Sequence, residues 1–148
     1  MEKVPVIQLR NAQRKQRVDL PALRQFASGA FERCLSSPGA KANAARDVSE
    51  LSVVLVSDRR IAQLHRRFMN IAGATDVLTF QHGEIVASVE TAQRNAARFG
   101  CSVDEEIQRY IVHGFLHLLG LNDKTAAERE TMERAQEKVL RSMRSASR

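Results

Sequence analysis

The chain has 148 residues, a length typical of one domain, and we expect residues 1–148 to form a single unit. Its 43% hydrophobic and 27% charged residues exclude a disordered or collagen-like protein. The 23 lysines and arginines exceed the 17 acidic residues, and the net charge of +6 favours a polyanionic partner such as nucleic acid. With no Trp, one Tyr and six Phe, we expect binding through phosphates without stacked bases.

Cysteine placement and hydrophobicity indicate where the protein works. Cys34 and Cys101 form no CxxC arrangement, which argues against a disulfide framework and a thiolate zinc site, so we expect small buried or half-buried residues. The first residues lack the apolar core of a signal peptide, and no stretch approaches the ~20 apolar residues that a bilayer span needs. We therefore expect a cytoplasmic protein that binds no membrane.

The first part of the chain is predicted to contain a strand, a helix and a second strand. Val4–Leu9 is a short β-branched run, and the basic segment Arg10–Arg17 after it indicates a loop. Asp19 can cap an amphipathic helix over Leu20–Leu35. Leu51–Val56 is again apolar and predicts the second strand.

A short, strongly basic helix is predicted next. Ser57 or Asp58 caps it, and it runs to about Met69. The apolar residues of its predicted buried stripe are Ile61, Leu64 and Phe68. The arginines on its remaining surface are Arg59, Arg60, Arg66 and Arg67. This surface is either a phosphate-binding patch for RNA or simply a solvated charged face.

A hairpin and a helix are predicted to follow. Val77–Phe80 and Glu84–Ser88 have strand character on either side of the turn 81–83, a pattern typical of a hairpin. Val89–Phe99 indicates a helix that ends at Gly100.

Capping boxes mark the start of the last two helices. Ser102 to Glu105 precedes the run Val103–Leu119, which is apolar nearly all round and predicts a central, buried helix. Thr125 to Glu128 opens the final helix, and residues 142–148 are expected to form a loose tail. The inward residues of the final helix are predicted to be Met132, Ala135, Val139 and Met143, with outward ion pairs Glu130–Arg134 and Glu137–Arg141. The predicted fold class is α+β, with a small mixed sheet packed on several helices.

The segment from His113 to Asp123 is the most informative part of the sequence. His113 and His117 are one helical turn apart, so both imidazoles can point at one ion, although such a pair alone is more often a surface or core feature. Gly120 stands where helices commonly end in a left-handed residue, and the turn can return Asp123 towards the histidines. We therefore predict one metal ion bound by His113, His117 and Asp123.

This ligand set is typical of a catalytic site. Two imidazoles and one carboxylate leave a fourth tetrahedral position for water, as in catalytic zinc sites. In the peptidase pattern H-E-x-x-H, the glutamate after the first histidine is the general base. Gly114 occupies that position here, which argues against a peptidase. We expect His113 and His117 to contribute to catalysis through the metal.

Two segments resemble the YbeY family of bacterial, metal-dependent proteins. Residues 113–123 read HGFLHLLGLND, which is similar to the family signature H-G-x-L-H-L-x-G-Y-D-H. Residues 74–80 read ATDVLTF, and with the Gly-Glu-Ile at 83–85 they resemble the family segment P-T-D-V-L-S-F and its following strand. The resemblance spans nearly the whole chain. It implies a zinc-dependent endoribonuclease that acts on single-stranded RNA of the small ribosomal subunit, in 16S rRNA 3′-end maturation and ribosome quality control.

The chain departs from the family pattern at three places. The usual third ligand is histidine, and the residue here is Asp123, which is a legitimate zinc ligand that changes the net charge of the site. Asn122 and Leu121 replace the preceding aspartate and tyrosine of the signature. Met69 stands where the family commonly carries an arginine implicated in RNA handling, and Arg66 or Arg67 would have to replace it.

Other polar residues near these motifs have two interpretations each. Glu106 lies two turns before His113 and either supports the metal site, acts as a base, or is a solvated or capping-turn glutamate. His82 either approaches the metal or is a surface residue of the turn. Thr75 and Asp76 either shape the site or cap the strand that follows.

Two other functions compete with a zinc ribonuclease. The loss of the family arginine at Met69 favours a non-catalytic, metal-containing factor that docks on ribosomal RNA through its arginines. A metal-dependent hydrolase of another substrate is the second alternative, and its activity should survive high salt.

Overall fold

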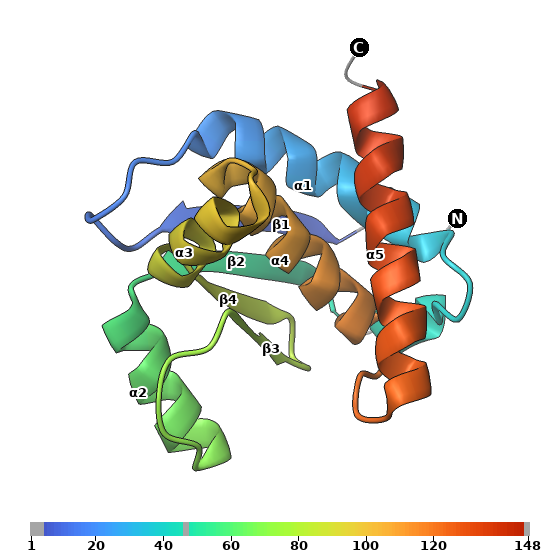
Figure 1. Cartoon of the computed structure of the whole chain (residues 1–148). Helices are drawn as coiled ribbons and strands as arrows, with labels where there is room; N and C mark the ends of the chain where they lie inside the picture. Colours follow the sequence, from blue (N-terminus) through green and yellow to red (C-terminus); the bar gives the residue numbers. More distant parts are fainter. Residues whose placement is uncertain (1–4, 46–47, 147–148) are drawn as a thin grey trace.

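A four-stranded mixed sheet lies at the centre of the fold (Figure 1). The computed structural model describes residues 5–45 and 48–146. The strand order is β1-β2-β4-β3, in which β2 pairs in parallel with β1 and β4, whereas β3 pairs antiparallel with β4. The strands are β1 (Val6–Asn11), β2 (Glu50–Val56), β3 (Val77–Phe80) and β4 (Glu84–Ser88). The predicted hairpin is therefore confirmed as β3 and β4.

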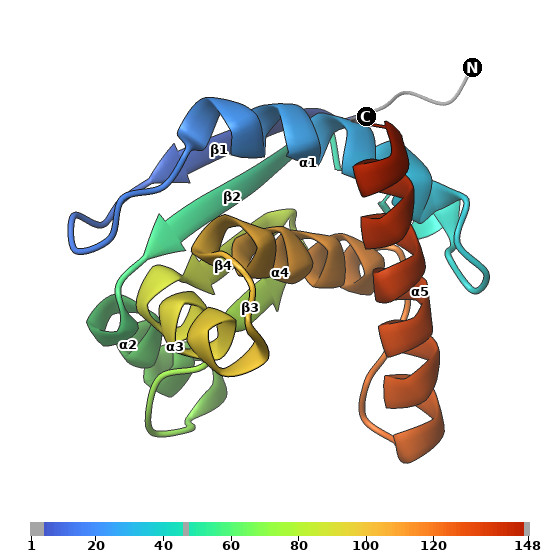
Figure 2. The same ribbon diagram turned by 45° about the horizontal axis from the view of Figure 1, so that its top comes forward.

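Helices cover both faces of the sheet, which explains why β2 and β4 are apolar along most of their length. On one face, α1 (Leu20–Leu35) and α4 (Val103–Leu118) form the main core, and Figure 2 shows both helices in front of the strands. On the other face, α2 (Asp58–Met69) covers a smaller core. The buried residues of that smaller core are Val54, Val56, Ile61, Leu78 and Val86.

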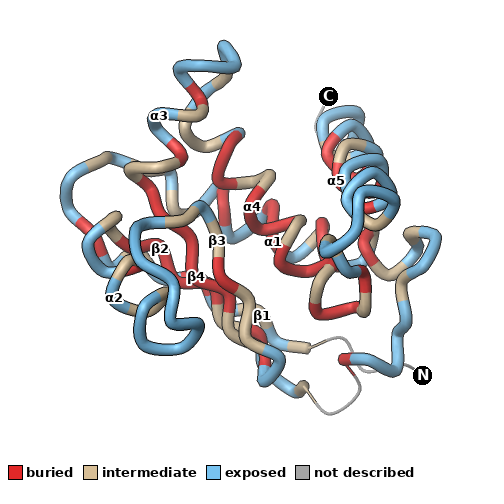
Figure 3. Tube along the Cα trace, turned by 60° about the horizontal axis from the view of Figure 1, so that its bottom comes forward, coloured by how far each residue is buried: buried red, intermediate tan, exposed pale blue. Residues whose placement is uncertain are grey.

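The helix α4 is buried, as its apolar sequence predicted. Its capping box is present, because Ser102 and Glu105 bond to each other's backbone amides. Gly114 faces the sheet, and a Cβ atom there would lie 2.7 Å from Cδ1 of Ile85 on β4. Only glycine therefore allows this close approach of helix and strand. Figure 3 shows the resulting band of buried residues along α4 and the central strands.

The remaining helices confirm the predicted caps. α3 (Val89–Phe99) ends at Gly100 with a left-handed backbone, and a short 3-10 helix spans Ala42–Ala45. The Thr125 capping box precedes α5 (Ala126–Ala146), whose inward residues are buried or half-buried as expected.

Several predicted boundaries and contacts are wrong. Residues 142–146 are not loose but continue α5, because Ser142 accepts a hydrogen bond from Arg33 of α1 (2.7 Å) and Met143 packs on the core. Residues 147–148 lie outside the described part. Glu137 pairs with Arg109 of α4 rather than with Arg141, whereas the Glu130–Arg134 pair is confirmed.

The first strand and the basic helix also differ from expectation. β1 extends to Asn11, because Arg10 and Asn11 pair with β2 and the edge position of β1 tolerates an exposed arginine. Val4, where the predicted strand began, is outside the described residues. In α2, only Ile61 is buried, and Phe68 is 57% exposed instead of belonging to a buried stripe. The helix projects away from the sheet at its C-terminal end (Figure 1), so Phe68 in its last turn meets the ring of Phe80 on β3 but stays largely exposed.

The α+β fold class with a mixed sheet and a central helix is confirmed. Cys34 is buried and Cys101 half-buried, and both are free thiols, as expected. Burial raises the pKa of the Cys34 thiol to about 12. Over the described ranges, every helix falls short of the length and apolar character that a membrane crossing requires.

Candidate metal centre

Two histidines occupy one side of the second half of α4. The rings of His113 and His117 have centroids 4.8 Å apart, and each side chain keeps 23% of its surface exposed. Ile111, Phe115 and Leu118 are buried on the other sides of the helix. The packing of these apolar residues fixes the rotation of α4, so both imidazoles are held at the surface next to each other.

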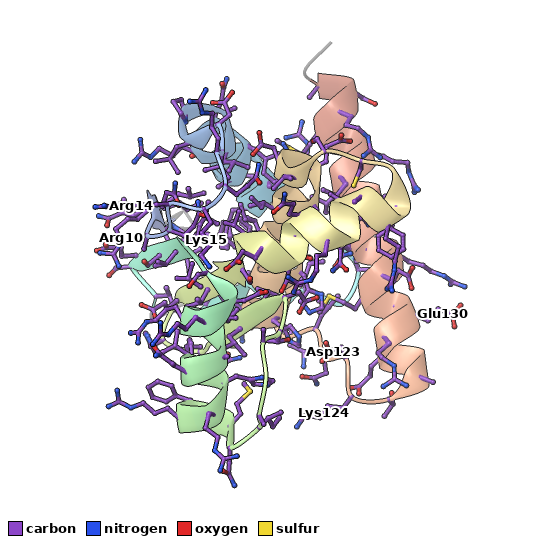
Figure 4. All side chains as sticks on the ribbon, turned by 60° about the vertical axis from the view of Figure 1, so that its left-hand side comes forward. Arg10, Arg14, Lys15, Asp123, Lys124 and Glu130 are labelled. Atoms are coloured by element: carbon purple, nitrogen blue, oxygen red, sulfur yellow. The ribbon has the colours of Figure 1, made fainter. Side chains whose placement is uncertain are left out.

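A tight turn returns the chain to the histidines. Gly120 adopts a left-handed backbone (φ 98°), its amide donates to the carbonyl of His117, and the Leu121 amide donates to that of Leu116. These two bonds form a Schellman motif, in which glycine avoids the strain of a positive φ. The turn places Asp123 Oδ2 at 3.4 Å from Nε2 of His113 and 3.2 Å from Nε2 of His117. Figure 4 shows Asp123 between α2 and α5.

The three side chains fit a tetrahedral metal ion. One ligand atom from each of His113, His117 and Asp123 lies within 4.8 Å of the other two. Donors 2.0–2.1 Å from a zinc ion at tetrahedral angles are about 3.3 Å apart, which matches the two distances from the carboxylate to the imidazoles. This donor set of nitrogen and oxygen atoms suits zinc and other divalent ions alike.

A residue that the sequence did not reveal contacts the first histidine. Gln136 of α5 is buried, and its Oε1 lies 3.1 Å from Nδ1 of His113. When Nδ1 carries the proton and donates to this oxygen, Nε2 is free to bind a metal ion on the side of Asp123. No sequence motif marks Gln136, because its role depends on how α5 packs against α4.

The surroundings of His113 favour its neutral form, which is the form that binds metal. Burial lowers the pKa of its imidazole, and the neighbouring His117 lowers it further. The hydrogen bond to Gln136 and the charges of Asp123 and Asp76 raise the pKa but do not outweigh these two causes. The Asp76 carboxylate caps β3 by accepting a hydrogen bond from the Val77 amide (2.8 Å), and its negative charge raises the pKa of His113.

Glu106 lies outside the three-residue cluster. Its side chain is buried, so Glu106 is not a solvated glutamate, but it lies in the first turn of α4, as the capping-turn interpretation held. It accepts a hydrogen bond from Nε of Arg109 (3.3 Å), and Arg109 also pairs with Glu137 of α5. This network ties α4 to α5 next to the site, and a role of Glu106 at the metal stays a prediction.

The predicted RNA-binding arginines lie on another element. Arg59, Arg60, Arg66 and Arg67 are all exposed on α2, on the opposite face of the sheet from α4. Met69 is 47% exposed at the end of the same helix. His82 is an exposed turn residue, as one interpretation held, and its ring stacks on Phe80 instead of joining the metal cluster.

Comparison with known proteins supports the resemblance seen in the sequence. The model of the family described as endoribonuclease YbeY matches residues 8–144. A protein named endoribonuclease YbeY from Bacteroides thetaiotaomicron is 37% identical over 100 residues, which cover 63% of this chain and 73% of that protein. One of the same name from Parabacteroides distasonis is 32% identical over 131 residues, which cover 83% of this chain and 88% of the relative.

A solved structure extends the similarity to the fold. The solution structure of TM1509 from Thermotoga maritima has a TM-score of 0.60 and 25% sequence identity, and the match covers 95% of this chain and 93% of the other. The family model, the curated relatives and the shared fold agree over most of the described residues. The chain therefore belongs to the YbeY family.

Proposed function

We propose that this chain is a zinc-dependent endoribonuclease that cuts single-stranded RNA. The single observation that carries the proposal is the convergence of the His113, His117 and Asp123 ligand atoms at one surface point of a YbeY-family chain. Relatives that share this family are named endoribonucleases. A net charge of +6 and the exposed arginines of α2 favour a polyanionic substrate.

Each residue of the site has a distinct task in this proposal. A zinc ion supplies Lewis acidity and lowers the pKa of a coordinated water towards ~7 when bound. His113, His117 and Asp123 hold the ion, and Gln136 orients the first imidazole through its hydrogen bond. Within residues 5–45 and 48–146 these are the three ligating groups that converge, and a tetrahedral zinc ion held by them would have a fourth position for water or a phosphate oxygen.

We further propose a cellular context for this activity. The chain would act in the cytoplasm on ribosomal RNA of the small subunit, in 3′-end maturation of 16S rRNA and in ribosome quality control. Support comes from membership of the YbeY family and from the basic charge. Sequencing the 16S rRNA 3′ ends in cells depleted of the protein would test it, and normal ends would contradict it.

The enzyme activity is tested by metal content and RNA cleavage together. Protein purified without a histidine tag should contain one equivalent of zinc by mass spectrometry, and the triple alanine variant of His113, His117 and Asp123 should contain none. The zinc-loaded protein should cleave unstructured rRNA fragments, whereas His113→Ala/His117→Ala should leave them intact. Equal cleavage by both proteins would contradict catalysis through the metal.

One observation favours a second function. Met69 replaces the arginine expected in the family, and it lies exposed at the end of α2. A non-catalytic factor that docks on rRNA would keep the metal for structure and need no such arginine. Zinc-loaded protein that binds rRNA fragments without cutting them, and whose Met69→Arg variant gains cleavage, would favour this function. Cleavage of a small substrate that survives high salt would instead indicate another hydrolase.

A further inference from the structure

Three rings form a continuous row at the end of α2. The rings of Phe68 on α2 and Phe80 on β3 meet edge to face, with centroids 5.3 Å apart. The ring of His82 in the following turn stacks on Phe80 at 5.9 Å with an angle of 27° between the planes. The guanidinium of Arg67 lies 5.3 Å from the centre of the Phe68 ring. The row therefore joins a helix, an edge strand and a turn.

The row is half-buried at its middle and exposed at both ends, with the Arg67 guanidinium over one face of Phe68. Phe80 is half-buried and packs against the smaller core, whereas Phe68 is 57% exposed and His82 is exposed. Met69 and Ile71 beside it are also exposed. Large apolar side chains gathered at the surface usually mark a binding site. A ring held in place by its neighbours loses little freedom when a ligand stacks on it.

The charge next to the row selects the ligand. Arg59, Arg60, Arg66 and Arg67 are exposed on α2, and the helix has a single acidic residue. That residue, Asp58, is at the opposite end of the helix and already pairs with Arg94 (2.7 Å). A partner for this surface must therefore present negative charge beside flat apolar groups. A nucleic acid with unpaired bases meets both requirements.

We propose that Phe68, Phe80 and His82 form a base-stacking subsite for single-stranded RNA, with Arg66 and Arg67 on the adjacent phosphates. The inference rests on the proposed ribonuclease function and names the part of the chain that selects unpaired bases. It also revises the expectation, drawn from the low aromatic content, that bases are not stacked. Few aromatic residues suffice when three of them share one row.

The position of β3 connects this subsite to the metal centre. β3 is the edge strand, with Leu78 and Phe80 facing the α2 side, and Val77 packing with the main core on the α4 side. α4, the helix that carries His113 and His117, also packs directly against β3. An RNA strand that passes over this edge would stack bases on one side and present a phosphodiester on the other.

Binding measurements on the full chain test the subsite. The probe is a fluorescein-labelled, unstructured oligoribonucleotide, followed by fluorescence anisotropy in a chelator that stops metal-dependent cleavage. Phe68→Ala should weaken binding about 10-fold, since stacking on one aromatic ring contributes roughly that much. Phe68→Leu should lose as much, because it keeps apolar bulk without a π face, whereas Phe68→Trp should retain affinity. His82→Ala should show a smaller loss in the same direction.

Two controls isolate stacking from other causes. Phe99 is 69% exposed on α3, outside the row, and Phe99→Ala should bind the oligonucleotide like the wild type. An abasic oligomer of equal length carries phosphates without bases, and it should bind Phe68→Ala and wild type equally. Thermal melting verifies that each variant is folded. If Phe68→Ala does not fold, Phe68→Leu takes its place in the comparison of RNA affinity with the wild type.

The outcomes separate this inference from the ribonuclease proposal. Wild-type affinity in Phe68→Ala and Phe68→Leu would overturn the subsite, and so would an equal loss for the abasic oligomer. If Phe68→Ala loses RNA affinity but Phe68→Leu binds like the wild type, the subsite would also be overturned, and the result would indicate an apolar protein partner. If the variants lose RNA affinity but the wild type never cleaves RNA, the subsite stands and the ribonuclease proposal fails. If the wild type cleaves RNA and the variants bind the oligonucleotide as tightly as the wild type, the ribonuclease proposal stands and the subsite fails.

Discussion

The helices α4, of 16 residues, and α2, of 12 residues, have opposite environments. α4 is packed on the sheet, on α1 and on α5, and a glycine brings it into close contact with Ile85. α2 buries one residue, Ile61, and is attached mainly at its first turn, where Asp58 bonds to Ser88, Thr91 and Arg94 of the β4–α3 junction. Its last turn, with Arg66 and Arg67, is exposed.

The difference corresponds to two requirements of the proposed chemistry. Metal ligands must be held within a fraction of an ångström, which buried helices achieve through packing. Long basic side chains that contact phosphates need reach and water more than a fixed position. Substitutions at α4 should therefore cost stability or metal affinity, and substitutions at the exposed end of α2 should change only binding. Four predictions test this contrast, from the largest effect to the smallest.

The contact between Gly114 and Ile85 should be the most sensitive. Gly114→Ala places a methyl group inside contact distance of three Ile85 atoms, and we expect about 3 kcal/mol of lost stability from overpacking. Urea unfolding measures the loss. Adding Ile85→Val removes the atom at 2.7 Å, so the double variant should cost less than the sum of the two single variants. Strict additivity would show that helix and strand are not in contact as described.

The hydrogen bond from α5 to His113 should affect metal affinity next. Gln136→Leu leaves Nδ1 without its acceptor, and we expect zinc affinity to fall about 30-fold, or about 2 kcal/mol. Competition with a chromophoric chelator measures it. Gln136→Glu keeps an acceptor oxygen and should restore most of the affinity. Unchanged zinc binding in Gln136→Leu would show that α4 orients the ring without help from α5.

The anchor of α2 should have a smaller, pH-dependent effect. Burial opposes ionisation of Asp58, but the bonds to Arg94, Ser88 and Thr91 outweigh it and lower its pKa from 3.8 to about 2. Two further charged groups lie at this junction: Glu90 accepts a hydrogen bond from the Asp58 amide and pairs with Lys15. Because the folded-state pKa is depressed, the stabilisation is complete above about pH 4 and disappears as the pH falls towards 2.

Asp58→Asn removes this charge and tests the anchor. The variant should lose about 1 kcal/mol at neutral pH, because the pair with the exposed Arg94 is solvent-screened. The stability difference from wild type, followed by urea unfolding, should shrink between pH 4 and 2. A difference that stays constant over this range would mean that the Asp58 carboxylate does not support the fold.

The arginines at the end of α2 should have the smallest effect on the fold. The free energy of unfolding of Arg66→Ala/Arg67→Ala should be within about 0.5 kcal/mol of the wild-type value, as is usual for surface substitutions. The RNA affinity of this variant should depend less on salt. The slope of the logarithm of the binding constant against the logarithm of the salt concentration should fall in magnitude by about 1.4 if each arginine contacts one phosphate. Arg98→Ala/Arg141→Ala removes two exposed arginines from α3 and α5 and provides the charge-matched control. A stability loss as large as that of Gly114→Ala would refute the contrast between the helices.

The caps and periodicities of the sequence predicted most of the fold because their causes are local. Ser102 with Glu105 defines the start of α4, and Gly120 defines its end. The same local logic brought His113, His117 and Asp123 together, since one turn of helix and one Schellman turn separate them. These relations extend over a few residues and are visible in a single sequence.

Features that depend on contacts between distant elements were not predicted. Gln136 meets His113 only because α5 packs against α4. Phe68 has the spacing of a buried residue, yet it is exposed because it lies beside the edge strand β3, where it meets the ring of Phe80. The end of α5 appeared loose by composition, but Ser142 and Met143 find partners on α1. Sequence periodicity indicates which residues share a face and not whether another element covers that face.

The glycine beneath the histidines also limits how this site can evolve. A glutamate at position 114 would complete the H-E-x-x-H pattern of metallopeptidases, but its Cβ would enter the space of the Ile85 side chain. One substitution therefore cannot convert the present ligand set into a peptidase site. A lineage would first have to shorten Ile85 or move α4 away from β4, and either change weakens the core before any new activity exists. The packing thus acts as a barrier between two chemistries that share the same pair of histidines.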